Sequence, residues 1–336
     1  MEPLSYVDLH RRLAPDIDAE LTAALDLLGP ESSPVRAAVA ALVGHRTFRY
    51  PLSALPLLVH AAETGDPRPA VPVSAVHQLW WISACHFDDV ADGSAQAHPG
   101  ELGADQAQLA AVVGGQLLPL RIIRELPGSE ALRARLCDEF VRASVAAADG
   151  QLSDLRADTG SATRDSVLAV YRGKSGAPFA MVTAMAALLA GASAPRVELW
   201  RELGSVFGLL WQFFNDQEDI TSGRHEDLAN GTVTHLLACA VEGLPAGAAA
   251  EFLARYGEAR GDGAARAEVL RTLLGTRAVE RFREDVEVRR RAAHGLLDEL
   301  GGVPQYMAAL RGLVDLSAET FLVPDDSRSG AVSVGG

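Results

Sequence analysis

Two long apolar runs of this chain each end in a group of oxygen-bearing side chains. The first acidic cluster is Asp88, Asp89 and Asp92, and the second acidic cluster is Asn215, Asp216 and Asp219. Residues three and four apart share one face of a helix, so the members of each cluster project together. Crowded carboxylates beside apolar residues repel one another unless a cation joins them. The pattern therefore predicts an oxygen-rich site for Mg²⁺ and, through Mg²⁺, for a diphosphate.

Nearly the whole chain has a helical pattern. Alanine and leucine are abundant, apolar residues recur at three- and four-residue spacing, and alternating β-branched runs are absent. We expect helices over residues 4–28, 33–44, 51–64, 72–92, 101–126, 129–149, 162–189, 196–220, 233–241, 246–258, 263–274 and 278–300. The predicted fold is all-α, a single-domain bundle of ten or more helices over residues 1–322, followed by a disordered tail at 323–336.

Composition excludes several classes of protein. A net charge of −14 argues against nucleic acid and anionic membrane surfaces as partners. The most apolar stretch, residues 180–189, is too short to cross a bilayer, so we expect no membrane insertion. Cys85, Cys137 and Cys239 are scattered and odd in number, which indicates a reduced, cytoplasmic protein without a disulfide framework.

Two shorter motifs lie between the acidic clusters. They read Gly150-Gln151-Leu152-Ser153-Asp154-Leu155 and Lys174-Ser175-Gly176-Ala177. Over roughly residues 35–300, the chain resembles the trans-type isoprenyl diphosphate synthases of the polyprenyl synthetase family. The two motifs are similar to that family's Gly-Gln-x-x-Asp-Leu and Lys-Thr-Gly-Ala. The two acidic clusters resemble its two aspartate-rich motifs, of which the second is usually Phe-Gln-x-x-Asp-Asp-x-x-Asp.

The resemblance implies a fold and a reaction. In that family, helices surround a deep apolar cavity, and three Mg²⁺ ions held by the two clusters help to ionise an allylic isoprenyl diphosphate. The candidate catalytic residues are Asp88, Asp89, Asp92, Asp216 and Lys174. Asn215 stands where the family has an aspartate, so Asp216 and Asp219 are expected to be the main metal ligands of the second cluster. We also expect a homodimer.

The same resemblance assigns residues that bind the substrate. Lys174 is expected to contact the diphosphate, because Gly173 and Gly176 beside it imply a close backbone approach. Gln212 is expected to face the cavity one helical turn before the second cluster. Arg224 is a candidate replacement for a lysine that usually follows the second motif.

The part of the family pattern that binds the second substrate, isopentenyl diphosphate, is incomplete. Arg46 and Arg49 could still hold its diphosphate, but Trp81 stands where the family has a histidine. No lysine or arginine occurs between Asp92 and Arg121, where the family has an arginine pair. Each missing charge-assisted contact is worth about 1.5–3 kcal/mol, so we expect weakened binding of this diphosphate.

Three outcomes for the prenyl cation therefore stay open. The main interpretation is transfer to isopentenyl diphosphate or another nucleophile. The alternative is a class I terpene cyclase acting on farnesyl or geranylgeranyl diphosphate, in which Trp80, Trp81 and Trp211 could steady cations through their π faces. A more remote alternative is a non-catalytic synthase subunit, although such subunits commonly lose the aspartates that this chain retains.

The length of the prenyl chain can also be inferred from the resemblance. Bulky residues four and five positions before the first aspartate stop chain growth in the family, and here those positions are Ser83 and Ala84. Trp80 and Trp81 lie one helical turn deeper, about 5 Å away. We therefore expect a C15 to C20 tail, within a range of C10 to C20 substrates.

Overall fold

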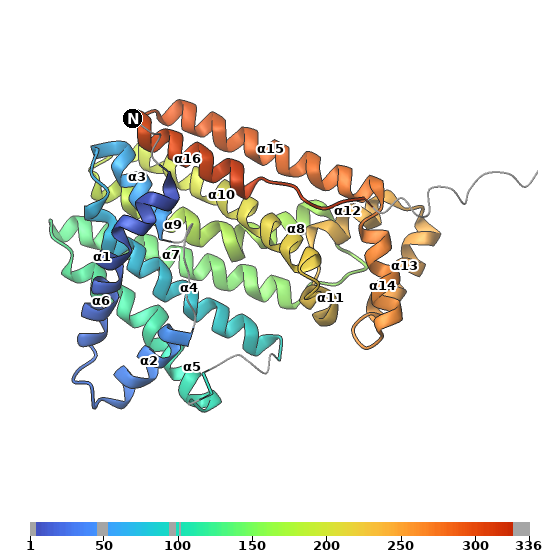
Figure 1. The fold of residues 1–336 in the computed structure, drawn as a ribbon, viewed down its shortest axis with the longest axis horizontal. Coiled ribbons are helices and arrows are strands. Elements are labelled where there is room, and N and C mark those ends of the chain that lie inside the picture. Colours follow the sequence, from blue (N-terminus) through green and yellow to red (C-terminus); the bar gives the residue numbers. More distant parts are fainter. Residues whose placement is uncertain (1–4, 46–52, 94–98, 101, 325–336) are drawn as a thin grey trace, which may run out of the picture. The chain divides into compact units, whose positions relative to one another are not determined.

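The computed structural model describes residues 5–45, 53–93, 99–100 and 102–324, and no β-strand occurs among them. Helices account for most of the described residues (Figure 1). In chain order they are α1 (Tyr6–Asp26), α2 (Pro34–His45), α3 (Ala54–Thr64), η1 (Arg68–Ala70), α4 (Val71–Ala91), α5 (Ala104–Val112), η2 (Val113–Leu117), α6 (Leu118–Glu125), α7 (Glu130–Leu155), α8 (Arg164–Tyr171), η3 (Arg172–Gly176), α9 (Ala177–Leu189), α10 (Ala194–Thr221), α11 (Glu226–Asn230), α12 (His235–Gly243), α13 (Ala246–Glu258), α14 (Gly263–Leu273), α15 (Thr276–Leu300) and α16 (Pro304–Ser317). The all-α prediction is confirmed.

Three details differ from the predicted helices. The predicted helices at 101–126 and 162–189 are each interrupted by a π-helical turn, η2 and η3. Helix α7 extends to Leu155, beyond its predicted end at residue 149. Helices α11 and α16 were not predicted. Helix α11 has only 5 residues. Helix α16 begins at Pro304, since proline is tolerated in the first turn of a helix.

The chain divides into two compact units. Unit 1 comprises residues 1–144, 178–204 and 296–313, and unit 2 comprises residues 145–177, 205–295 and 314–336. Helices α7, α9, α10, α15 and α16 contribute residues to both units. No single linker in the sequence marks this division, because each unit draws on three separate stretches.

Helix α4 is the centre of unit 1. It packs against α1, α3, α5, α6 and η2 (Figure 1). Its buried residues face in all directions around the helix axis from Val71 to His86, as expected for a helix without a polar stripe. The first acidic cluster begins two residues after His86, so the packing of α4 fixes the position of that cluster.

Glycines allow helices of unit 1 to touch closely. A Cβ atom on Gly115 of η2 would lie 2.3 Å from the Cβ atom of Ser83 on α4. A Cβ atom on Gly204 of α10 would lie 2.5 Å from the Phe179 carbonyl oxygen and 2.4 Å from Thr183 Oγ1, both on α9. Atoms do not approach this closely without a shift of the backbone, so both positions require glycine.

We expect Gly204→Ala to destabilise the protein by about 1–3 kcal/mol, because the new methyl group overlaps the α9 backbone. The measurement is the midpoint of urea unfolding. Gly312→Ala on α16 is the matched control, since nothing lies within 4 Å of its added Cβ. That change should raise stability by about 0.5–1 kcal/mol. Equal effects of the two substitutions would contradict the proposed packing.

Candidate functional site

The first acidic cluster lies at the C-terminal end of α4 in unit 1. Asp88 and Asp89 are partly exposed, and Asp92 is exposed. Asp92 is the C-cap residue, keeps helical backbone angles (φ −79°, ψ −4°) and donates its N–H to the Asp88 carbonyl oxygen at 2.9 Å. Helical spacing therefore extends through Asp92. The last turn of α4 has no basic residue, although the C-terminus of a helix carries partial negative charge.

The residues expected to limit the length of the prenyl chain lie on the preceding turns of α4. Ser83 is 1% exposed and packs against Gly115, so helix packing also requires its small size. Ala84 is half-buried. Trp80 Nε1 donates to Ser144 Oγ at 3.2 Å, which fixes that indole against α7. The Trp81 ring lies 5.3 Å from that of Phe179.

The second acidic cluster lies near the C-terminal end of α10 in unit 2. Asp216 is 4% exposed, and both of its carboxylate oxygens accept hydrogen bonds. Tyr171 OH donates to Oδ2 at 2.6 Å, and Gln212 Nε2 donates to Oδ1 at 2.9 Å. Ser175 Oγ in turn donates to Gln212 Oε1 at 2.5 Å. Residues of α8 and η3 therefore fix the orientation of the Asp216 carboxylate.

Asp219 connects the second cluster to α11. Its two oxygens accept the backbone N–H groups of Glu226 at 3.0 Å and Asp227 at 3.3 Å, in the first turn of that helix. The helix follows His225, whose φ of 52° is unusual for a residue other than glycine. This geometry brings Asp227 to the second cluster. The sequence pattern does not single out Asp227, because no continuous helix links it to Asp219.

Burial and mutual repulsion perturb these carboxyl groups. Burial raises the pKa of Asp216 to about 7, although the hydrogen bonds from Tyr171 and Gln212 oppose the shift. Burial also raises the pKa of Asp227 well above its usual value, and the charges of Asp216 and Asp219 add to this effect. The second cluster therefore favours binding of positive charge, either protons or metal ions.

Lys174 faces the same cluster. It lies in η3, which crosses α7 backbone to backbone: a Cβ on Gly150 would lie 2.5 Å from the Lys174 backbone nitrogen, and one on Gly173 would lie 2.7 Å from the Gly150 Cα. This contact places Lys174 Nζ 2.9 Å from Asp154 Oδ2. The Lys174 charge acts to lower the pKa of Asp216. The two short motifs therefore meet, and the glycines permit the contact.

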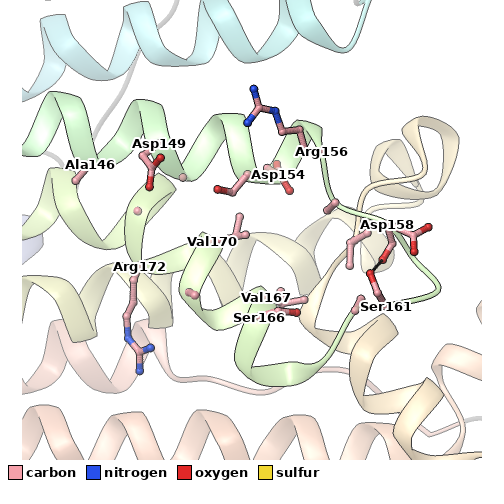
Figure 2. Close-up of a pocket in the computed structure, with 17 residues that line it drawn as sticks. Ala146, Asp149, Asp154, Arg156, Asp158, Ser161, Ser166, Val167, Val170 and Arg172 are labelled. Atoms are coloured by element: carbon pink, nitrogen blue, oxygen red, sulfur yellow. Dashed lines mark hydrogen bonds between the residues drawn. The ribbon is translucent and has the colours of Figure 1, made fainter.

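A cavity of about 670 Å³ lies beside this crossing, between α7 and α8. Asp154 on α7 and Val170 on α8 lie on facing sides of it, whereas the Arg172 side chain extends away (Figure 2). The cavity has the size of a small-molecule site. Through Asp154 it adjoins the Lys174 ion pair.

Two of the arginines named in the sequence analysis, Arg46 and Arg49, lie outside the described residues. Arg224 is half-exposed, and its Nε atom is 4.0 Å from Asp219 Oδ1. The Asn215 side chain is half-buried on α10 beside Asp216. The predicted roles of these residues stay predictions.

A third polar group, formed by His235, Cys239 and Asp285, has potential metal-ligand atoms within 4.8 Å of one another. Its chemistry favours a structural role. Asp285 accepts hydrogen bonds from Arg164 at 3.0 Å and Arg289 at 2.8 Å, so its charge is already compensated. Burial raises the pKa of the Cys239 thiol to about 12, which keeps it protonated. A thiol binds metal only as the thiolate.

Comparison with known proteins identifies the chain's relatives. Residues 58–272 match the family model described as polyprenyl synthetase. No match was found among curated proteins. No helix of the described residues is both long and apolar enough to cross a membrane.

Solved structures with the same fold cover almost the whole chain. A polyprenyl synthetase from Streptomyces coelicolor A3(2) is 20% identical, with 93% of this chain and 98% of that chain covered and a TM-score of 0.78. A polyprenyl synthase from Caulobacter crescentus CB15, complexed with calcium and isoprenyl diphosphate, is 20% identical, with 93% and 97% covered and a TM-score of 0.78. A geranylgeranyl pyrophosphate synthase from Corynebacterium glutamicum, complexed with isoprenyl diphosphate and magnesium, is 18% identical, with 94% and 99% covered and a TM-score of 0.77. These likenesses confirm the predicted isoprenoid synthase fold.

The raised pKa of Asp216 makes the stability of the metal-free protein depend on pH. Its folded-state pKa of about 7 exceeds the usual 3.8, so its contribution to stability is fully present below pH 3.8 and is lost as pH rises towards 7. Between pH 5 and pH 8, the melting temperature in EDTA should therefore fall more for the wild type than for Asp216→Asn. The loss is up to about 1.4 kcal/mol for each pH unit crossed below 7.

Asp18→Asn is the matched control, because Asp18 is an exposed aspartate of α1. This variant should retain the pH dependence of the wild type. If Asp216→Asn lost as much stability between pH 5 and pH 8 as the wild type, the assignment of the raised pKa to Asp216 would be wrong.

Proposed function

Because the chain belongs to the polyprenyl synthetase family, we propose that it is a Mg²⁺-dependent enzyme that ionises a C10 to C20 allylic isoprenyl diphosphate and transfers the prenyl group to an acceptor. Prenyltransferase activity on isoprenyl diphosphates follows from membership of the family. The metal dependence, the chain length and the acceptor are the proposed parts.

One observation carries this proposal: carboxylates gather at the C-terminal ends of two helices, α4 and α10, neither of which has a basic residue in its last turn. The partial negative charge of a helix C-terminus adds to the repulsion among the carboxylates. Burial raises the pKa of both Asp216 and Asp227, and the charges of Asp216 and Asp219 raise the pKa of Asp227 further. Oxygen-ligated divalent cations would relieve this repulsion.

The donor set fits Mg²⁺, which prefers oxygen ligands. We propose that each acidic cluster holds Mg²⁺, three ions in total, with Asp227 beside the second cluster. Bound Mg²⁺ would stabilise the negative charge that develops on the diphosphate as its C–O bond breaks. Lys174 would donate to a diphosphate oxygen, exchanging its contact with Asp154 for one with the substrate.

Two kinds of group could capture the prenyl cation. Transfer to isopentenyl diphosphate or another nucleophile is our main proposal. Cyclisation is the second candidate, and the aromatic group on α4 and α9 favours it: the Trp81 and Phe179 rings lie 5.3 Å apart, and His77 meets both edge-on. Aromatic faces of this kind stabilise carbocations.

The direct test is to incubate the protein and Mg²⁺ with geranyl, farnesyl or geranylgeranyl diphosphate, each with and without isopentenyl diphosphate. A longer diphosphate formed only with isopentenyl diphosphate supports chain transfer, and hydrocarbon formed without it supports cyclisation. Asp89→Asn should reduce turnover by about 10²-fold or more, because electrostatic stabilisation of the leaving group is lost. Exposed Asp18→Asn should retain activity. Failure of the wild type to consume any allylic diphosphate would support the non-catalytic alternative.

We further propose that the protein is a homodimer joined through α7. Four residues of this helix form an apolar, exposed stripe: Val145, Ala148, Leu152 and Leu155. Val145 is 64% exposed, Leu152 50% and Leu155 56%. Their spacing of three, four and three residues is that of a coiled-coil seam, which can pair with a second copy of itself.

Val145→Glu combined with Leu152→Glu should convert the dimer to a monomer, because each two-fold interface would then bury four uncompensated carboxylates. Sedimentation velocity measures the change in mass. Val288→Glu on α15 is the matched control, since Val288 is also exposed, at 47%, but lies outside the stripe. A wild-type protein that sediments as a monomer would contradict this proposal.

A further inference from the structure

We propose that Tyr171 is a positioning residue: its hydroxyl group holds the Asp216 carboxylate in the orientation that binds a metal–diphosphate complex. This inference rests on the proposed function. In the sequence, Tyr171 lies three residues before Lys174 and has the pattern of an ordinary buried helix residue, so it does not stand out as part of a site.

The hydroxyl group of Tyr171 joins three helices of unit 2. Tyr171 is the last residue of α8, is 4% exposed, and meets the Phe213 ring of α10 edge-on with centroids 6.1 Å apart. Its O–H donates to Asp216 Oδ2 at 2.6 Å. Its oxygen accepts the backbone N–H of His235, the first residue of α12, at 3.0 Å. The hydroxyl group is therefore fixed by a donor on one side and an acceptor on the other.

This arrangement strengthens the bond to Asp216. The first N–H groups of a helix have no partner within the helix and lie at its positive end. By accepting the His235 N–H, the Tyr171 oxygen is polarised, and its own O–H becomes a better donor. The partial positive charge of α12 thus reaches the Asp216 carboxylate through a single side chain.

Tyr171 does not act on Asp216 alone. The other carboxylate oxygen is held by Gln212, whose amide is oriented by Ser175. Donors on both oxygens prevent rotation of the carboxylate, and each oxygen keeps a lone pair for a metal ion. Tyr171 and Ser175 flank Lys174 in one continuous segment. The same segment therefore places the diphosphate-binding lysine and orients the metal-binding carboxylate.

Hydrogen bonds of this kind tune metal affinity by 10- to 100-fold in other metal sites. The test is Tyr171→Phe, which keeps the ring against Phe213 and removes only the hydroxyl group. Binding of Mn²⁺ in the presence of inorganic diphosphate is measured by electron paramagnetic resonance, which needs no turnover. We expect the variant to bind Mn²⁺ about 10-fold more weakly than the wild type. For the allylic substrate, kcat at fixed Mg²⁺ should fall more than KM rises.

The matched control is Tyr306→Phe. Tyr306 of α16 is also a buried tyrosine, at 5% exposed, but its hydroxyl group donates to the Gly65 carbonyl oxygen rather than to a carboxylate. It should bind Mn²⁺ as the wild type does. Ser175→Ala is the second test variant if Tyr171→Phe does not fold; it should weaken Mn²⁺ binding in the same direction, because Gln212 loses its orienting donor.

The outcomes separate this inference from the proposed function. Wild-type protein that binds Mn²⁺ and diphosphate while Tyr171→Phe binds them within two-fold would overturn the positioning role and leave the proposed function intact. Equal weakening in Tyr171→Phe and Tyr306→Phe would overturn it as well, since loss of any buried hydroxyl group would then suffice. Wild-type protein without diphosphate-dependent Mn²⁺ binding would overturn the proposed function and this inference together.

Discussion

Repulsion among carboxylates at helix C-termini is the constraint on which the rest of this protein depends. Both clusters follow apolar helical runs, and the buried Asp216 and Asp219 cannot reach solvent unless α10 unwinds. The second cluster is more deeply buried than the first, with Asp216 and Asp219 both under 7% exposed. A protein retains such a costly arrangement where the charge is used, and divalent cations are the partners that both satisfy oxygen ligands and attract a diphosphate.

The second cluster depends on precise backbone contacts as much as on its own side chains. Gly150 and Gly173 let α7 and η3 touch, which sets Lys174 against Asp154. The π-helical turn η3 carries this lysine, and such turns are common at functional sites. On the other side, the first turn of α11 donates to Asp219. Helix packing in unit 2 therefore determines the electrostatics of the cluster.

The two acidic clusters are complete, whereas the pattern for binding the second substrate is not. The two steps of the proposed reaction, ionisation and capture of the cation, therefore constrain the sequence to different degrees. In the proposed reaction, ionisation of an allylic diphosphate needs metals and a shielded cation, and the acidic clusters and the aromatic side chains of α4 are the candidates for these two tasks. Capture of the cation needs a positioned nucleophile, for which many arrangements suffice. Helix α4 carries Trp80 and Trp81 one turn before the small residue Ala84. This pattern is compatible with two nucleophiles: isopentenyl diphosphate, which adds an isoprene unit, or a double bond of the substrate itself.

The sequence by itself determined the helical fold, the approximate extent of most helices and the two acidic clusters, because helical spacing and metal chemistry are both local in the chain. It did not reveal α11, Asp227 or Tyr171 as parts of the site. Asp227 reaches the cluster through a loop in which His225 has a left-handed backbone conformation. Tyr171 contacts Asp216, although the two residues are 45 positions apart in the sequence. Only the tertiary structure could decide these contacts, since they depend on how helices cross, and crossings leave no periodic pattern in a sequence.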